Sequence, residues 1–68
     1  MIKNTVGALR AQNGLTQEEL ARRLKVTRQT IISLEKNRYT PSLEMAFKVA
    51  AEFGKSVEEV FTYWADTH

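Results

Sequence analysis

The side chains best suited to chemistry in this 68-residue chain lie at residues 27–36, and that chemistry is hydrogen bonding to nucleic-acid bases. The Gln29 amide can pair bidentately with N6 and N7 of adenine. The Arg28 guanidinium can pair with O6 and N7 of guanine or hold a phosphate. The short hydroxyls of Thr27 and Ser33 can bond to either bases or phosphates. These residue types in one short segment therefore predict a base-reading surface.

Ile32 adds an apolar side chain to this group. Helical spacing places it opposite Ile31 and Leu34, which fill the inward stripe of the expected helix. Contact with a thymine methyl would explain an exposed Ile here. A position in the core or at a dimer interface explains it equally well. We include Ile32 among the expected DNA contacts and keep both alternatives open.

Polar and basic residues flank the segment on both sides. Gln17 lies in the first turn of an expected helix, where free amides and the helix dipole favour a phosphate. Lys36, Asn37 and Arg38 follow the segment as a basic, hydrogen-bonding loop that suits phosphate contacts. An ordinary helix C-terminus also favours cations, so Lys36 alone does not decide the matter.

Charge divides the chain into two unequal halves. Residues 1–38 carry eight Lys and Arg against three Glu, a net charge of +5, whereas residues 39–68 carry two against five acidic residues, a net charge of −3. Such asymmetry indicates that one half faces a polyanion. Chance clustering on solvated helix faces would give the same totals.

Catalytic and metal-binding functions find little support. The chain has no cysteine, and its one histidine, His68, is the final residue, so disulfides and thiolate metal sites are excluded. The paired glutamates at 18–19 and 58–59 belong to helix starts. We therefore expect no enzyme, metal, cofactor or small-molecule ligand. No apolar run approaches the ~20 residues of a membrane span and no signal-peptide pattern is present, so we expect a cytoplasmic protein.

Helix start and stop signals predict five short helices in a single all-α domain, residues 1–68. Capping boxes at Thr16–Glu19 and Ser56–Glu59 begin the second and fifth helices. The first helix is expected to begin near Asn4 or Thr5 and end before Gly14; Thr27 caps the third, and the fourth runs from near Ser42 to Gly54. A broad apolar face is expected on the fourth helix, made of Leu43, Ala46, Phe47, Val49, Ala50 and Phe53.

The second and third of these helices, at about residues 16–36, have the spacing of a helix-turn-helix motif. About three residues separate them, too few for an antiparallel hairpin of long helices. In helix-turn-helix geometry the first helix crosses the phosphate backbone and the second enters the major groove.

The run LTQEELARRLKVTRQTIISLEKNRYTPS, residues 15–42, resembles the lambda-repressor-like helix-turn-helix family, also called Xre or Cro/C1-type. The shared motif comprises TQEELA, RQTI, LExN and YxPSL, and the resemblance covers about residues 3–64. It implies a compact five-helix lambda-repressor-like fold. It also implies a sequence-specific regulator of transcription that binds double-stranded DNA, a repressor that binds an inverted-repeat operator as a homodimer.

The resemblance also implies roles for individual positions. Gln17 would contact a phosphate and brace Gln29, and Arg10 and Glu35 would form a partly buried ion pair. Base edges would be read by Arg28, Gln29 and Ser33, and the DNA backbone would be contacted by Asn37 to Thr40. One departure concerns the turn, where family members commonly carry Gly and this chain has Lys25. A positive φ there would cost a residue other than Gly about 1 kcal/mol.

Two large aromatic residues, Tyr63 and Trp64, lie near the C-terminal end of the chain and need partners. Small members of the family dimerise through the fifth helix, and some pair a short N-terminal strand with a C-terminal one. We therefore predict a two-stranded ribbon between Met1–Lys3 and Thr62–Trp64. The expected dimer interface comprises Val60, Phe61, Tyr63 and Trp64.

Two other functions share this fold. A DNA-binding antitoxin would need a further surface to hold its toxin, and little chain remains for one. A pure protein–protein adaptor would not show the steep salt dependence of DNA binding.

Overall fold

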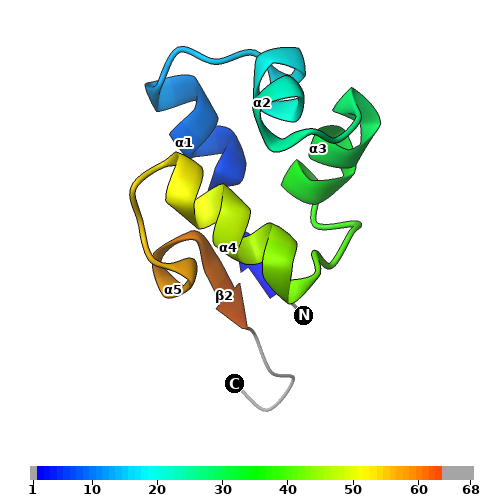
Figure 1. Ribbon diagram of the computed structural model, residues 1–68. Coiled ribbons are helices and arrows are strands. Elements are labelled where there is room, and N and C mark those ends of the chain that lie inside the picture. The colour runs from blue at the N-terminus through cyan, green and yellow to red at the C-terminus, as the bar shows by residue number, and fades with distance from the viewer. Residues whose placement is uncertain (1, 64–68) are drawn as a thin grey trace.

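The computed structural model describes residues 2–63 as five helices and one two-stranded antiparallel sheet. The elements in chain order are β1 (Ile2–Asn4), α1 (Val6–Gln12), α2 (Gln17–Leu24), α3 (Arg28–Glu35), α4 (Leu43–Glu52), α5 (Val57–Val60) and β2 (Phe61–Tyr63). Helices α2 and α3 lie at one end of the molecule, and α5 and the sheet lie at the other (Figure 1). The predicted five-helix fold with a terminal ribbon is confirmed.

Side-chain caps explain where the helices begin. In α2, the Thr16 hydroxyl accepts a hydrogen bond from the Glu19 amide at 3.0 Å, and the Thr16 amide donates to Glu19 Oε1 at 2.8 Å. Ser56 and Glu59 repeat this arrangement at the start of α5. Two orphan amides are satisfied in each box, so both helix starts follow directly from the local sequence.

The two boxes make stability depend on pH. Backbone hydrogen bonds from Thr16 and Ser56 lower the pKa of Glu19 and Glu59 below the ordinary Glu value. A depressed folded-state pKa adds stability that is present above the unfolded-state pKa and is lost as pH falls through the folded-state pKa. We expect the double variant Glu19→Gln, Glu59→Gln to lose less stability than the parent chain between about pH 5 and pH 3. Gln keeps the capping acceptor without titrating.

Urea unfolding at several pH values measures this difference. Glu58→Gln removes a neighbouring carboxylate that is not the reciprocal member of the box, and it serves as the charge control. Equal pH slopes for the double variant and Glu58→Gln would contradict the prediction.

Lys25 takes the left-handed conformation that its place in the turn requires, with φ of 60°. The glycines that end α1 and α4, Gly14 and Gly54, occupy the same region at φ of 69° and 64°. A side chain other than Gly pays a steric cost there. We expect Lys25→Gly to be more stable than Lys25→Ala by about 0.5 to 1 kcal/mol, after the greater unfolded-state entropy of Gly is counted.

Lys25→Ala is the matched control because it removes the same charge and keeps Cβ. Chemical denaturation of both variants measures the difference. Equal free energies of unfolding for the two variants would show that the turn stores no strain.

The core lies where α1, α2, α3, α4 and α5 meet. Its largest fully buried side chains are Leu20, Ile31, Leu34, Val6, Val49 and Val60. Val60 is only 1% exposed, so its predicted place in a dimer interface is wrong. Its side chain is already covered by the protomer's own helices.

The predicted apolar face of α4 is partly wrong. The buried side chains of this helix are Met45, Ala46, Val49 and Ala50. Leu43 and Phe47 are 72% and 59% exposed. At 100° per residue these two side chains fall outside the buried stripe, whose centre lies between Val49 and Ala46. Apolar residue type alone made the predicted face too broad.

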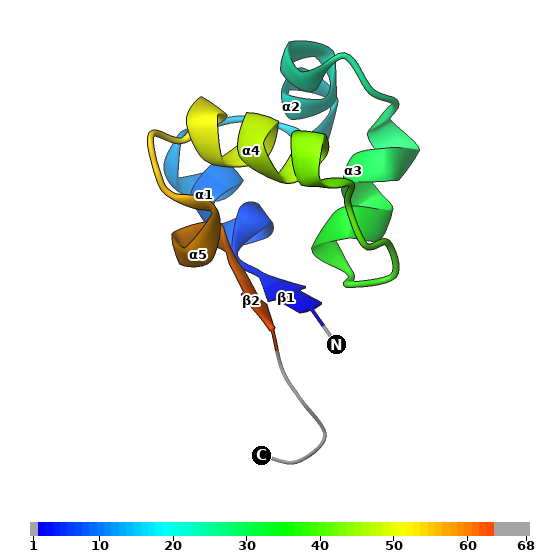
Figure 2. The same cartoon turned by 60° about the horizontal axis from the view of Figure 1, so that its bottom comes forward.

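The sheet joins the two ends of the chain in the predicted antiparallel manner. Ile2 pairs with Tyr63, Lys3 with Thr62 and Asn4 with Phe61. The strands are displaced by one residue from the predicted ranges, and Met1 and Trp64 lie outside the described residues. The Thr5 amide extends the pairing by donating to the Val60 carbonyl at 3.0 Å. Figure 2 shows β1 and β2 side by side below α5 and α1.

None of the helices within residues 2–63 combines the length and apolar character that crossing a membrane requires.

Candidate nucleic-acid interface

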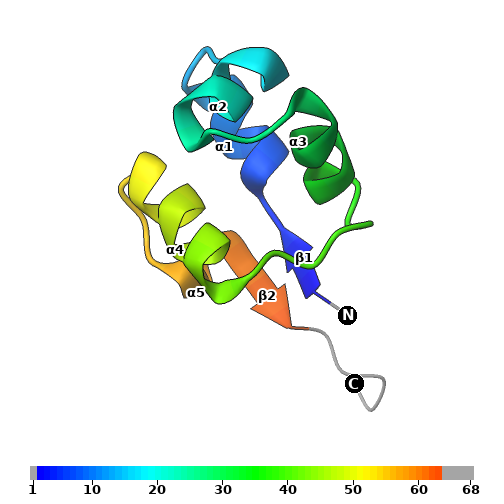
Figure 3. The same ribbon diagram turned by 45° about the vertical axis from the view of Figure 1, so that its right-hand side comes forward.

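Helices α2 and α3 are joined by three residues and meet at an angle, as Figure 3 shows. The Val26 amide donates to the Ala21 carbonyl at 3.0 Å, which closes α2, and Thr27 then caps α3 by accepting from the Thr30 amide. Lys48 of α4 donates to the Leu24 carbonyl at 3.0 Å. This last contact holds the turn against α4, and the local sequence gives no sign of it.

The exposed side of α3 carries the side chains that were expected to read bases. Arg28 and Gln29 are exposed, Ser33 is partly exposed, and Ile31 and Leu34 face the core. Gln29 Nε2 lies 3.4 Å from Ser33 Oγ, so the two side chains already lean together along this face. A donor–acceptor pair of this kind, free of the core, can exchange its weak internal bond for a base edge.

Ile32 is partly exposed and lies outside the buried core cluster. The core explanation for this residue therefore does not hold. Contact with a thymine methyl and contact with a second chain both remain compatible with its position.

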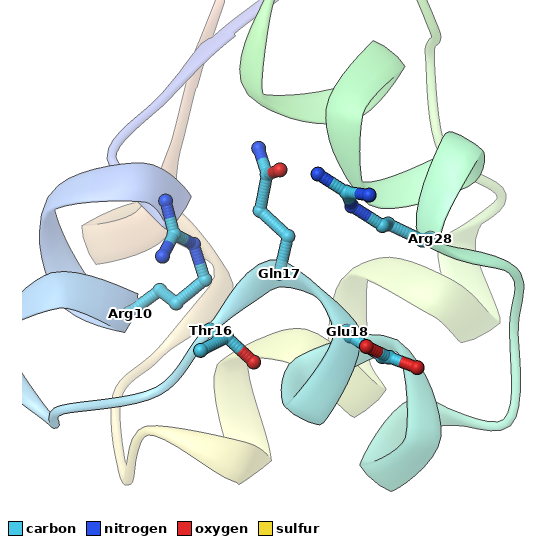
Figure 4. A pocket seen from close by; sticks show the side chains of 5 residues that line it. All are labelled: Arg10, Thr16, Gln17, Glu18 and Arg28. Carbon is cyan, nitrogen blue, oxygen red and sulfur yellow. The ribbon is translucent and has the colours of Figure 1, made fainter.

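A pocket opens at the N-terminus of α2, beside the exposed face of α3. It is lined by Arg10, Thr16, Gln17, Glu18 and Arg28. In Figure 4 the Gln17 side chain lies between the guanidinium groups of Arg10 and Arg28. Arg28, the Gln17 amide and the N-terminus of α2 suit a phosphate oxygen, whereas the charge of Arg10 is balanced by Glu35 and Glu18 adds a carboxylate to the lining. The expected phosphate-contacting role of Gln17 thus has a physical setting.

Arg10 and Glu35 form the ion pair that the family resemblance implies. Arg10 Nε lies 2.7 Å from Glu35 Oε2, and Nη2 lies 3.2 Å from Oε1. Arg10 Nη1 also donates to the Leu15 carbonyl at 2.9 Å. The two side chains are 21% and 13% exposed, and the hydrogen bond to Glu35 raises the pKa of Arg10. The pair joins α1, the loop before α2 and the end of α3.

Gln17 braces a different partner from the expected one. Its Nε2 donates to Glu35 Oε1 at 3.2 Å, whereas Gln29 bonds to Ser33. A carboxylate is the stronger acceptor, which explains the preference. The expected bond from Gln17 to Gln29 is not formed. Gly7 completes this site, because a Cβ there would lie 3.3 Å from Glu35 Oε1. No motif in the sequence indicated this role of Gly7.

The loop after α3 is exposed and adjoins the exposed face of α3. Its expected contacts, Lys36, Asn37, Arg38 and Thr40, are all exposed. Asn37 has a positive φ of 58°. A shallow pocket connects this loop to α3 and is lined by Thr27, Gln29, Thr30, Ser33, Arg38 and Tyr39. Thr30 is an addition to the expected set: it lies one position from Gln29, and its hydroxyl bonds to that of Thr27 at 2.9 Å.

Comparison with known proteins agrees with this architecture. The helix-turn-helix family model matches residues 6–60. An uncharacterized HTH-type transcriptional regulator of Methanocaldococcus jannaschii is 51% identical over 65 residues, covering 96% of this chain and 98% of the relative. Another from Bacillus subtilis is 45% identical over 60 residues, covering 88% of this chain and 91% of the relative.

Solved structures show the same fold. A crystal structure of a protein from Bacteroides fragilis has a TM-score of 0.80 and 26% identity, covering 91% of this chain and all of that one. The clp gene regulator ClgR from Corynebacterium glutamicum has a TM-score of 0.72 and 31% identity, covering 79% of this chain and 57% of that one.

The fold and the exposed polar face of α3 thus define a DNA-binding domain of the helix-turn-helix class. The chain belongs to the lambda-repressor-like, or Xre, branch of the helix-turn-helix family. Its relatives and its fold are those of transcriptional regulators and not of enzymes.

Proposed function

We propose that this protein is a sequence-specific repressor that binds an inverted-repeat operator in double-stranded DNA as a homodimer, with α3 in the major groove. The observation that carries the proposal is the continuity of two surfaces. The exposed face with Arg28, Gln29 and Ser33 adjoins the pocket in which Gln17 lies between two guanidinium groups. One surface suits base edges and the neighbouring one suits a phosphate.

The exposed aromatic side chains of β2 support the homodimer. Tyr63 is 69% exposed on β2, and Phe61 is partly exposed. A domain of this size gains much from oligomerisation, since a small core stabilises it only marginally. A twofold dimer would place two copies of α3 about 34 Å apart, one DNA turn, which explains the inverted repeat. Trp64, the other expected interface residue, lies outside the described residues.

The proposed site of action is the cytoplasm. The lack of cysteine is compatible with a reducing compartment.

Fluorescence anisotropy tests the proposal directly. The purified protein is titrated against the duplex upstream of its own gene and against a scrambled duplex of the same composition, each at two salt concentrations. We expect the upstream duplex to bind at least 1,000-fold more tightly, as specific sites typically do. Equal, strongly salt-dependent binding to both duplexes would mean that only the phosphate term acts. Failure to bind either at low salt would refute DNA binding.

A further inference from the structure

Asn4, the last residue of β1, uses its side chain to connect three segments of the molecule. Its Oδ1 accepts a hydrogen bond from the Val6 amide at 3.0 Å, which starts α1. Its Nδ2 donates to the Leu34 carbonyl at 2.8 Å and to Asn37 Oδ1 at 3.1 Å. Thirty or more residues of chain separate Asn4 from the last two partners. The amide thus bonds α3 and the following loop to the N-terminal strand.

The two distant partners of Asn4 lie where α3 ends and the chain reverses. The Asn37 amide donates to the Leu34 carbonyl at 3.1 Å, and the Arg38 amide donates to the Ser33 carbonyl at 2.9 Å. Asn37 holds a positive φ between them. The conformation is costly for a side chain other than Gly and persists where surrounding contacts maintain it. Asn4 supplies one of those contacts from outside the loop.

We infer that Asn4 is a positioning residue for DNA binding. It fixes the end of α3 and the loop at residues 37–40 so that the loop meets a phosphate in register with the bases that α3 reads. Asn4 need not touch DNA, because it acts through the Leu34 carbonyl and Asn37. The inference rests on the proposed function, in which α3 and this loop contact DNA.

The connection also links the terminal sheet to the DNA-facing surface. Asn4 pairs with Phe61 in the sheet while its amide holds the end of α3. The strand that carries Asn4 is therefore anchored on one side by β2 and on the other by α3. A rigid anchor of this kind lowers the ordering cost that a mobile loop would pay on binding.

The test compares Asn4→Ser with Asn13→Ser in the full chain. Ser at position 4 can still accept from the Val6 amide but is too short to reach Leu34. Asn13 is a matched control, because its Nδ2 donates to the Leu9 carbonyl at 2.7 Å at the end of α1. Each variant loses an Asn hydrogen bond to a helix-terminal carbonyl, at α3 for Asn4→Ser and at α1 for Asn13→Ser. Asn4→Ser also loses the bond to Asn37 Oδ1 in the loop after α3.

We expect Asn4→Ser to bind the upstream duplex about three- to tenfold more weakly, the equivalent of roughly one hydrogen bond. The slope of log K against log salt should become shallower by about 0.9, the value for one lost phosphate contact. Amide exchange of Arg38 should be faster. Asn13→Ser should keep the affinity, the slope and the Arg38 exchange rate of the parent chain.

A lower folded fraction alone would weaken binding without changing the salt slope, so destabilisation cannot imitate the expected result. Asn4→Ser with the affinity and slope of Asn13→Ser would overturn the inference and leave the proposed function intact. Failure of the parent chain to prefer the upstream duplex would overturn both.

Discussion

Glu35→Ala is expected to lower the free energy of unfolding by about 2 to 3 kcal/mol. Breaking a buried ion pair by removing one partner costs about 3 to 5 kcal/mol. The two side chains here are 21% and 13% exposed, so solvent screening reduces that figure. Stabilities of about 0.05 to 0.15 kcal/mol per residue give this chain roughly 3 to 10 kcal/mol in total. Glu35 thus carries a large share of the stability.

The loss of stability is large because Glu35 accepts hydrogen bonds from more than one side chain. Its Oε1 accepts from both Arg10 and Gln17. Without the carboxylate, Arg10 becomes an uncompensated charge in a partly buried site and Gln17 loses its brace. Thermal unfolding should show a midpoint lower by roughly 10 to 20 °C for a domain of this size.

An exposed pair provides the control. Arg22 and Glu18 are 3.8 Å apart on the surface of α2, one helical turn from each other. Arg22→Ala should change the free energy of unfolding by less than about 0.5 kcal/mol. The double variant Arg10→Ala, Glu35→Ala should lose less than the sum of the single losses, since each removes the same interaction. A Glu35→Ala loss no greater than that of Arg22→Ala would contradict the prediction.

Local signals in the sequence were enough to predict the helix starts and the motif. Caps at Thr16, Thr27 and Ser56 are short-range features that depend on three or four consecutive residues. The left-handed turn at Lys25 was anticipated from the family resemblance, because family members commonly carry Gly at this position. Fold class followed because these signals also fixed the spacing of the helices.

The features that could not be predicted depend on segments distant in sequence. Asn4 bonds across thirty residues to Leu34, and Lys48 of α4 bonds to the turn after α2. No sequence pattern near Asn4 or Lys48 indicates which residue it will bond to. The same holds for Gln17, because only the packed structure shows that the Glu35 carboxylate lies within reach of its amide. Residue type predicted which side chains could form hydrogen bonds, and tertiary packing determined their partners.

The prediction of which α4 side chains are buried was partly wrong because it relied on residue type. Leu43 and Phe47 are apolar, as core residues usually are, but their positions around the helix axis place them outside its buried side. In a small five-helix domain only one side of each helix packs on the core, so the position around the helix axis decides which apolar side chains are buried.

Gln29→Ala is expected to weaken binding to the operator by about 10- to 100-fold while leaving binding to a scrambled duplex unchanged. A bidentate amide–adenine pair contributes about 1 to 3 kcal/mol of discrimination. Gln29 is exposed and makes only a 3.4 Å contact with Ser33, so its loss should hardly affect folding. The salt slope should not change, because no phosphate contact is removed. Anisotropy titrations of both duplexes measure the affinities, and thermal unfolding checks the fold.

Lys36→Ala should have the opposite signature. Removing one exposed cation next to α3 should weaken binding to all duplexes alike and reduce the salt slope by about 1. Lys55, an exposed lysine between α4 and α5, is the matched control, and Lys55→Ala should leave both quantities unchanged.

Equal losses for Gln29→Ala on operator and scrambled DNA would show that Gln29 does not read a base.

Modified bases can locate the contact of Gln29 on the DNA. Replacing operator adenines one at a time with 7-deazaadenine removes N7 and keeps Watson–Crick pairing. At the adenine that Gln29 reads, the substitution should weaken binding of the parent chain but cause no further loss in Gln29→Ala, because the two changes remove the same interaction. At every other adenine the two proteins should lose affinity equally. If no adenine shows this non-additivity, Gln29 does not form the bidentate pair, and specificity then depends on Arg28, Ser33 and Ile32 or on the shape of the operator.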